Sequence, residues 1–232
     1  HSISAIVDDG DEVILPSPYW LTYPELIKLA GGKVVYVSAL KENDYKMTAE
    51  QFSKAITKKT KALILNSPNN PTGSVYTEKE IKEIAKICEE HNIYVISDEI
   101  YEKLIYDGEK HYSIAQVSEN MKNHTIVING MSKSYSMTGW RIGYLAAPND
   151  IAKAIGSMQS HTASNPTSFA QYASVTALTD KQGEEFIKKM QKIFDERRQY
   201  MYNTLKKIDK LEPICPKGAF YVFINIKNYI VI

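Results

Sequence analysis

Residues 132–144 read SKSYSMTGWRIGY, and the chemistry of this stretch decides how the fold is interpreted. It places Lys133 eight positions before Arg141, just after the strand-like apolar run 125–128. A lysine amine forms an imine with an aldehyde once it is deprotonated, which a cleft holding other positive groups favours. A guanidinium offers a planar fork of N–H groups that matches a phosphate. The spacing therefore predicts an aldehyde-binding amine beside a phosphate-binding guanidinium.

A second stretch lies upstream, where residues 93–101 read IYVISDEIY. It offers a carboxylate, Asp98, and a phenol, Tyr101, at the end of another buried strand. A cofactor that uses a pyridine ring as an electron sink needs a carboxylate facing its ring nitrogen, and Asp98 is the best candidate in the chain. Tyr101 could reach a hydroxyl on such a ring. Together the two stretches fit pyridoxal phosphate.

Short apolar runs alternate with helical patterns through the first two thirds of the chain. The strand-like runs are Val13–Leu15, Val34–Val37, Ala62–Leu65, Tyr94–Ile96, Thr125–Ile128 and Gly143–Ala146. This alternation predicts an α/β fold with a mostly parallel sheet covered by helices. In such sheets ligands bind beyond the carboxyl ends of the strands, where Asn66, Asp98 and Lys133 fall.

Helical signals are clearest in two places. Thr77 and Glu80 form a capping-box pattern before a run with apolar residues on one face. From Asn149 onward the chain is helical, with a long polar helix over 181–209 and a strand-like run over 221–226. We therefore predict a cofactor-binding large domain over 1–180 and the start of a small α+β C-terminal domain over 181–232.

Composition favours a small-molecule partner. The 232 residues are 44% hydrophobic and 24% charged, enough for a sizeable core, and 28 basic against 27 acidic residues give a net charge of +1. No basic tract points to nucleic acid, and no apolar run approaches the ~18 residues that span a membrane. Two cysteines, Cys88 and Cys215, make no disulfide framework, so we expect a cytoplasmic protein. We predict no metal site.

Each candidate also has a purely structural explanation. A lone lysine after a strand is usually a solvated surface residue, a carboxylate there usually caps a helix, and an arginine in a Gly-Trp-Arg turn is often an ion-pair partner. Trp20 and Tyr101 are more often core aromatics than cofactor contacts, and Asn70 in an Asn-Pro-Thr-Gly turn is ordinarily a turn residue. The order in which they occur together favours the functional explanation.

That order closely resembles the fold-type I, pyridoxal-phosphate-dependent aminotransferases of class I/II, in particular the aspartate aminotransferase-like group, along essentially the whole chain. The resemblance implies that Lys133 forms the Schiff base with pyridoxal 5′-phosphate and that Arg141 binds its phosphate. It implies that Trp20 stacks on the cofactor ring and that Asp98 binds the ring nitrogen. Asn70 and Tyr101 would bind the ring hydroxyl.

The implied activity belongs to amino-acid metabolism. It moves an amino group between an L-amino acid, with aspartate the first guess, and a 2-oxo acid such as 2-oxoglutarate. The resemblance also implies a homodimer with residues 164–168 near the subunit interface. The alternative for Asn165 is that it caps a helix beginning near Pro166.

The family pattern is incomplete in this chain. We expect a partial chain lacking both ends, because the glycine-rich phosphate loop would precede His1 and the arginine for the substrate carboxylate would follow Ile232. Gly130 stands where several relatives have a phosphate-binding hydroxyl, and we do not expect Ser132 to replace it. The same cofactor site also serves other fold-type I enzymes, such as carbon–sulfur β-lyases or cyclopropane-forming synthases. A non-catalytic sensor domain of a transcription regulator is a further alternative.

Overall fold

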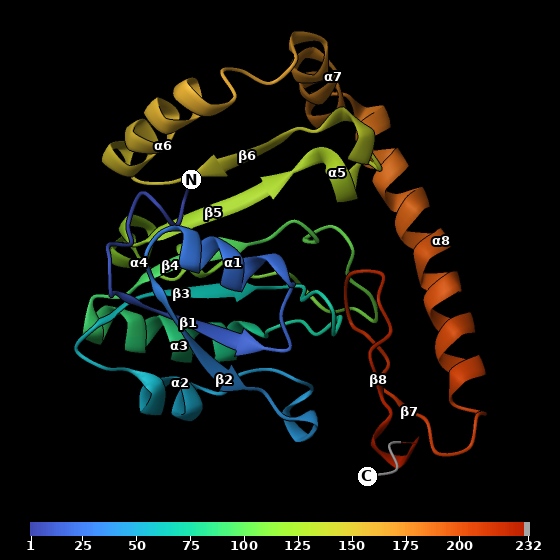
Figure 1. Cartoon of the computed structure of the whole chain (residues 1–232). Coiled ribbons are helices and arrows are strands. Elements are labelled where there is room, and N and C mark those ends of the chain that lie inside the picture. The colour runs from blue at the N-terminus through green and yellow to red at the C-terminus, as the bar shows by residue number, and fades with distance from the viewer. Residues whose placement is uncertain (230–232) are drawn as a thin grey trace.

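A computed structural model describes residues 1–229 and contains one six-stranded sheet with helices on both faces (Figure 1). The strands are β1 (Glu12–Ser17), β2 (Lys33–Ser38), β3 (Thr60–Asn66), β4 (Tyr94–Asp98), β5 (Thr125–Gly130) and β6 (Gly143–Ala146). Their order is β2-β1-β3-β4-β5-β6, with only β6 antiparallel to its neighbour. All six predicted strands and the mostly parallel α/β arrangement are confirmed.

The helices are α1 (Thr22–Leu29), α2 (Ala49–Ala55), α3 (Glu78–His91), α4 (Glu119–Asn123), α5 (Met131–Ser134), α6 (Asn149–Thr162), α7 (Ser168–Thr179) and α8 (Lys181–Leu205). Helices α2, α3 and α4 share one apolar core with one face of the sheet, whereas α1 and α6 share a second core with the other face. Burying both faces explains why the central strands read as continuous apolar runs.

Helix α3 follows the capping pattern in the sequence. The Thr77 side chain accepts the Glu80 backbone N–H at 3.3 Å, and the Glu80 carboxylate accepts the Thr77 N–H at 2.7 Å. Ile81 and Ile84 are buried against the sheet. The helix ends at Asn92, whose left-handed backbone (φ 54°) closes the last turn.

The C-terminal part differs from the prediction. Helix α8 ends at Leu205 rather than 209, because the chain turns there and Lys210 takes a left-handed conformation (φ 60°). The strand expected over 221–226 is reduced to β8 (Ile224–Asn225), which pairs with β7 (Glu212–Pro213). Pro213 has no N–H to extend that pairing. The division at 180/181 stays a prediction.

None of the helices in residues 1–229 combines the length and apolar character needed to cross a bilayer.

Candidate active site

A cavity of about 390 Å³ opens at the carboxyl ends of β3, β4 and β5. It is within the range of small-molecule sites, roughly 300–1,000 Å³. Its walls contain all six predicted site residues, Trp20, Asn70, Asp98, Tyr101, Lys133 and Arg141. They also contain Tyr23, Asn66, Ile100, Ile128, Ser132, Thr138 and Tyr221. Residues far apart in the sequence therefore meet because parallel strands end at one edge of the sheet.

Asp98 is the last residue of β4 and is held by two donors. The Tyr23 hydroxyl donates to one carboxylate oxygen at 2.6 Å, and the Ile100 N–H donates to the other at 3.2 Å. Burial raises the pKa of Asp98, although these two hydrogen bonds oppose the rise. Burial also raises the pKa of Tyr23 well above its usual value, so Tyr23 remains a donor. Since each oxygen has a second lone pair, the carboxylate can still accept from a ligand.

Lys133 lies in α5, the single turn that follows β5. Its Nζ is 5.7 Å from the centre of the Tyr101 ring and 5.4 Å from that of Phe220. Lys133 is half-buried, and within residues 1–229 its amine forms no ion pair or hydrogen bond. It is therefore not a solvated surface lysine, and its amine is available to a ligand.

Arg141 follows the 3₁₀ turn Thr138–Trp140 and takes a left-handed conformation (φ 53°). One guanidinium N–H donates to the Thr138 carbonyl at 2.7 Å. In the described part of the chain no carboxylate pairs with Arg141, so the ion-pair explanation does not apply. The remaining N–H groups can bind an anion in the cavity.

The other three predicted residues line the same cavity. Trp20 is 43% exposed and meets Tyr23 edge-on at 5.4 Å, so it is no core residue. The backbone N–H of Asn70 donates to the Asn66 side-chain oxygen at 2.8 Å. Tyr101 is buried, and its hydroxyl lies 2.7 Å from that of Tyr221.

Asn66 was expected at this edge of the sheet without a role, and it ends β3 in register with Asp98. Two cavity tyrosines were missed in the sequence. Tyr23 lies on the buried face of α1 and resembles any core aromatic. Tyr221 follows Tyr101 by 120 residues, and nothing local indicates that they meet.

Two residues near Lys133 can now be placed. Ser132 lines the cavity, whereas Gly130 packs against β6, where a Cβ would lie 3.0 Å from the Gly143 Cα. That close approach explains why no hydroxyl residue stands at position 130.

The helix-cap alternative for Asn165 is wrong. Helix α7 begins at Ser168, its N-cap residue is Thr167, and Asn165 is exposed.

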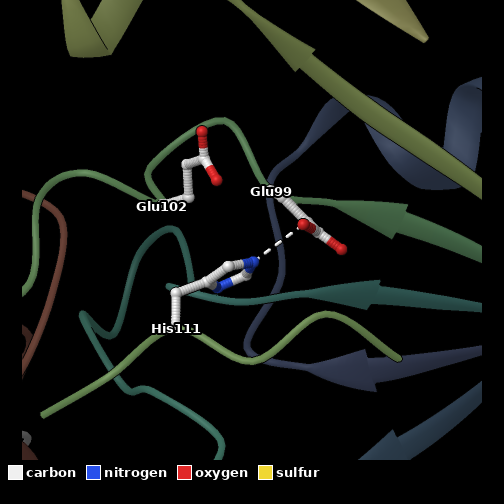
Figure 2. A group of neighbouring side chains, drawn as sticks. All are labelled: Glu99, Glu102 and His111. Atoms are coloured by element: carbon white, nitrogen blue, oxygen red, sulfur yellow. Dashed lines mark hydrogen bonds and ion pairs between the residues drawn. The ribbon is translucent and has the colours of Figure 1, made fainter. Parts of the chain in front are cut away.

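Next to Asp98, Glu99 belongs to a separate polar network, in which it meets His111 (Figure 2). Glu99 and His111 do not line the cavity. The Glu99 carboxylate accepts hydrogen bonds from Ser97 at 2.8 Å, Ser113 at 2.6 Å and the His111 Nε2 at 2.7 Å. Burial raises the pKa of Glu99, but the bonds from His111 and Ser113 outweigh burial and hold it below the usual value. Glu102 also lies close by, and the Glu99 carboxylate is already held by Ser97, Ser113 and His111, which accounts for the group as a buried hydrogen-bonded network.

The cavity residues fit pyridoxal phosphate. Among residues 1–229, an amine without an ion-pair partner, an arginine without a carboxylate and a carboxylate held by two donors face one space. These are the groups that an aldehyde, a phosphate and a ring nitrogen require. The cavity also offers the aromatic face of Trp20 for a cofactor ring, and the polar groups of Asn70 and Tyr101 for a ring hydroxyl.

Comparisons with known proteins agree with this description. The family model for aminotransferase class I and II matches residues 2–230. The chain is 52% identical over 223 residues to the aspartate aminotransferase of Bacillus subtilis, covering 96% of this chain and 56% of that protein. It is 47% identical over 225 residues to a probable aspartate/prephenate aminotransferase of Aquifex aeolicus, covering 97% and 57%.

Solved structures give the same result. The aspartate aminotransferase of Thermus thermophilus with maleate superimposes with a TM-score of 0.94 at 41% identity, over 98% of this chain and 58% of that one. An aromatic aminotransferase from Pyrococcus horikoshii has a TM-score of 0.93 at 43% identity, over 96% and 59%. The chain thus spans somewhat more than half the length of the relatives it matches, and it belongs to the aminotransferase class I and II family.

Proposed function

We propose that the full-length protein containing this chain is a pyridoxal 5′-phosphate-dependent aminotransferase. The observation that carries the proposal is that Lys133 in α5, Asp98 at the end of β4 and Arg141 after the turn Thr138–Trp140 line one cavity, with neither cation paired to a carboxylate in the described residues. Unpaired charged groups around a cavity are typical of a ligand site. The names of the relatives, aspartate aminotransferase and probable aspartate/prephenate aminotransferase, support the same activity.

Pyridoxal phosphate, when bound, supplies an aldehyde carbon and a ring that withdraws electrons. In the proposed site the Lys133 amine would hold the aldehyde, and the same amine would serve as general base and acid that moves a proton at the substrate carbon. Asp98 would keep the ring nitrogen protonated, and Arg141 would hold the phosphate. Trp20 would lie against the ring, while Asn70 and Tyr101 would hold the ring hydroxyl.

For the substrates, we propose aspartate as amino donor and 2-oxoglutarate as acceptor. Aspartate rests on the relatives' names, and 2-oxoglutarate on the family resemblance. Aromatic donors are the second candidate, because the Pyrococcus horikoshii neighbour is named an aromatic aminotransferase.

We propose a homodimer as the assembled form. Helix α7 exposes Phe169, Tyr172 and Val175, which are 65%, 77% and 59% exposed, and an apolar face of this kind is typical of an interface. Light scattering of the full-length protein tests this, and an active monomer would contradict it. We also propose a cytoplasmic location, because Cys88 and Cys215 are both free thiols.

The decisive experiment loads the full-length protein with pyridoxal phosphate, reduces it with borohydride and locates the adduct by mass spectrometry. The proposal expects the adduct on Lys133 and none after Lys133→Ala. A panel of amino donors, followed by loss of the visible cofactor absorbance, then identifies the substrate. Release of an oxo acid with aminated cofactor supports transamination, whereas pyruvate with ammonia would indicate a β-lyase instead.

A further inference from the structure

The segment that carries Tyr221 is held between two loops that border the cavity. The Gly218 N–H donates to the Gly73 carbonyl at 2.8 Å, and the Ala219 N–H donates to the Leu104 carbonyl at 2.9 Å. Gly73 lies in the loop after β3 and Leu104 in the loop after β4. Backbone hydrogen bonds therefore fix Tyr221 in the cavity wall, although it comes from the C-terminal part of the chain.

Tyr221 meets Tyr101 through its hydroxyl. The two oxygens are 2.7 Å apart, and the rings stand nearly perpendicular, 79° at 5.8 Å between centres. Tyr101 is 3% exposed, so its hydroxyl has little access to water. Burial raises the pKa of Tyr101 and so does the bond to Tyr221, which keeps Tyr101 protonated. Tyr101 therefore keeps its hydroxyl hydrogen in this contact.

Only one hydrogen can lie between two phenol oxygens, and each phenol has one hydrogen to give. If Tyr101 donates to Tyr221, Tyr101 presents only lone pairs to the cavity. If Tyr221 donates, the Tyr101 hydrogen is free to point at a ligand oxygen. An electron-rich oxygen in the cavity favours the second arrangement, since a chain of hydrogen bonds in one direction strengthens each member.

We propose that Tyr221 is a positioning residue whose hydroxyl donates to Tyr101, and so directs the Tyr101 hydrogen to an acceptor oxygen on the ring of the bound cofactor. The inference rests on the proposed function. It adds a residue from the C-terminal segment to the site and links the docking of that segment to the electronic state of the ring oxygen.

The test uses Tyr221→Phe in the full-length protein, which removes the hydroxyl and keeps the ring. Its matched control is Tyr106→Phe. The Tyr106 hydroxyl donates to the Ala219 carbonyl at 2.6 Å, so the control removes a hydroxyl that holds the same segment without touching the cavity. Two quantities are measured with added pyridoxal 5′-phosphate, its dissociation constant and the pH midpoint of the absorbance change of the bound form.

Tyr221→Phe should weaken binding roughly three- to tenfold, the range of one lost hydrogen bond. It should also raise the pH midpoint by roughly 0.3–1 unit, because a donor to the ring oxygen favours its deprotonated form. Tyr106→Phe should leave the midpoint unchanged. Adding Tyr221→Phe to Tyr101→Phe should have no further effect on it, since the hydrogen that Tyr221 directs is then absent.

Three results would overturn the inference: a wild-type midpoint in Tyr221→Phe, equal shifts in Tyr221→Phe and Tyr106→Phe, or additive shifts in the double variant. Failure of the proposed function looks different, because the wild-type protein itself would then take up no cofactor, and the inference would fall with it. Thermal unfolding of the cofactor-free variants provides a second check. If the two hydroxyls are hydrogen-bonded to each other, the melting temperature of the Tyr101→Phe, Tyr221→Phe double variant should fall by less than the sum of the decreases in the two single variants. Additive decreases would again overturn the inference.

Discussion

Two clusters of charged side chains border the loop after β4, and they differ in how their polar atoms are used. Around Arg198 every group has a partner. Its guanidinium donates to both oxygens of Asp107 at 2.7 and 2.8 Å, to Asp195 at 2.8 Å and to the Pro216 carbonyl at 2.7 Å. Around Lys133 neither the amine nor Arg141 has a carboxylate partner in the described residues.

The difference separates a structural cluster from a binding site. Arg198 is buried and ties α8 to the loop after β4 and to the turn at Pro216. A cluster that satisfies its own donors has nothing left for a ligand. The Lys133 cavity keeps charged groups free, an arrangement that is stabilised when a complementary ligand binds. Substitutions in the two clusters should therefore affect different measured quantities.

The largest effect is expected for Lys133→Ala, which under the proposed function removes both the amine that binds the aldehyde and the general base. The proton transfer alone accounts for a rate loss of about 10²–10⁴-fold. Covalent uptake of the cofactor should vanish while the melting temperature stays near that of the wild type. Lys153→Ala, an exposed lysine on α6, is the control. Retained cofactor absorbance in Lys133→Ala would contradict the assignment.

Asp98→Asn should be the next most harmful to activity, with a loss of about 10²–10³-fold, since under the proposed function it removes the charge that holds a proton on the ring nitrogen. The amide is similar in size to the carboxylate and can still accept from Tyr23, so the fold should persist. Steady-state rates and cofactor affinity measure the effect. Activity within threefold of the wild type would remove Asp98 from the site.

Arg198→Met should instead cost stability, about 2–4 kcal/mol, because it breaks a buried ion pair and leaves the Pro216 carbonyl without its donor. Below its melting temperature the variant should still bind the cofactor. Arg197→Met on the exposed face of α8 should change stability by no more than about 0.5 kcal/mol. Denaturant unfolding measures both. Equal losses of unfolding free energy in Arg198→Met and Arg197→Met would show that the Arg198 cluster has no special structural role.

The smallest expected effect is a pH dependence of stability. The Arg198 hydrogen bonds lower the pKa of Asp107 from 3.8 to about 2. The folded state therefore binds this proton less readily than the unfolded state. The resulting stabilisation is complete above pH 3.8 and is lost as the pH falls through about 2. The melting-temperature difference between wild type and Asp107→Asn should shrink over that interval, and a constant difference would show that the carboxylate charge contributes nothing.

The sheet was predictable because its strands are buried on both faces and read as apolar runs, for example Ala62–Leu65. The long helix was predicted with its end four residues too late. Residues 206–209 follow the helix and contain side chains that are common in helices, but Lys210 takes a left-handed backbone conformation that ends the helical path. The strand over 221–226 was wrong in length, because strand pairing depends on a partner that the local pattern does not reveal.

Local chemistry pointed to Lys133, Arg141, Asp98 and Tyr101, because an amine, a guanidinium, a carboxylate and a phenol near strand ends are visible in the sequence, whereas Trp20 and Asn70 were added by the family resemblance. Local chemistry did not indicate Tyr23 or Tyr221. A tyrosine on a helix face or in a C-terminal turn resembles any other, and its role depends on the hydroxyl it meets. The hydrogen bond between Tyr23 and Asp98 joins residues 75 positions apart, and that between Tyr101 and Tyr221 joins residues 120 apart. Side-chain type is encoded residue by residue, whereas such contacts exist only once the chain has packed.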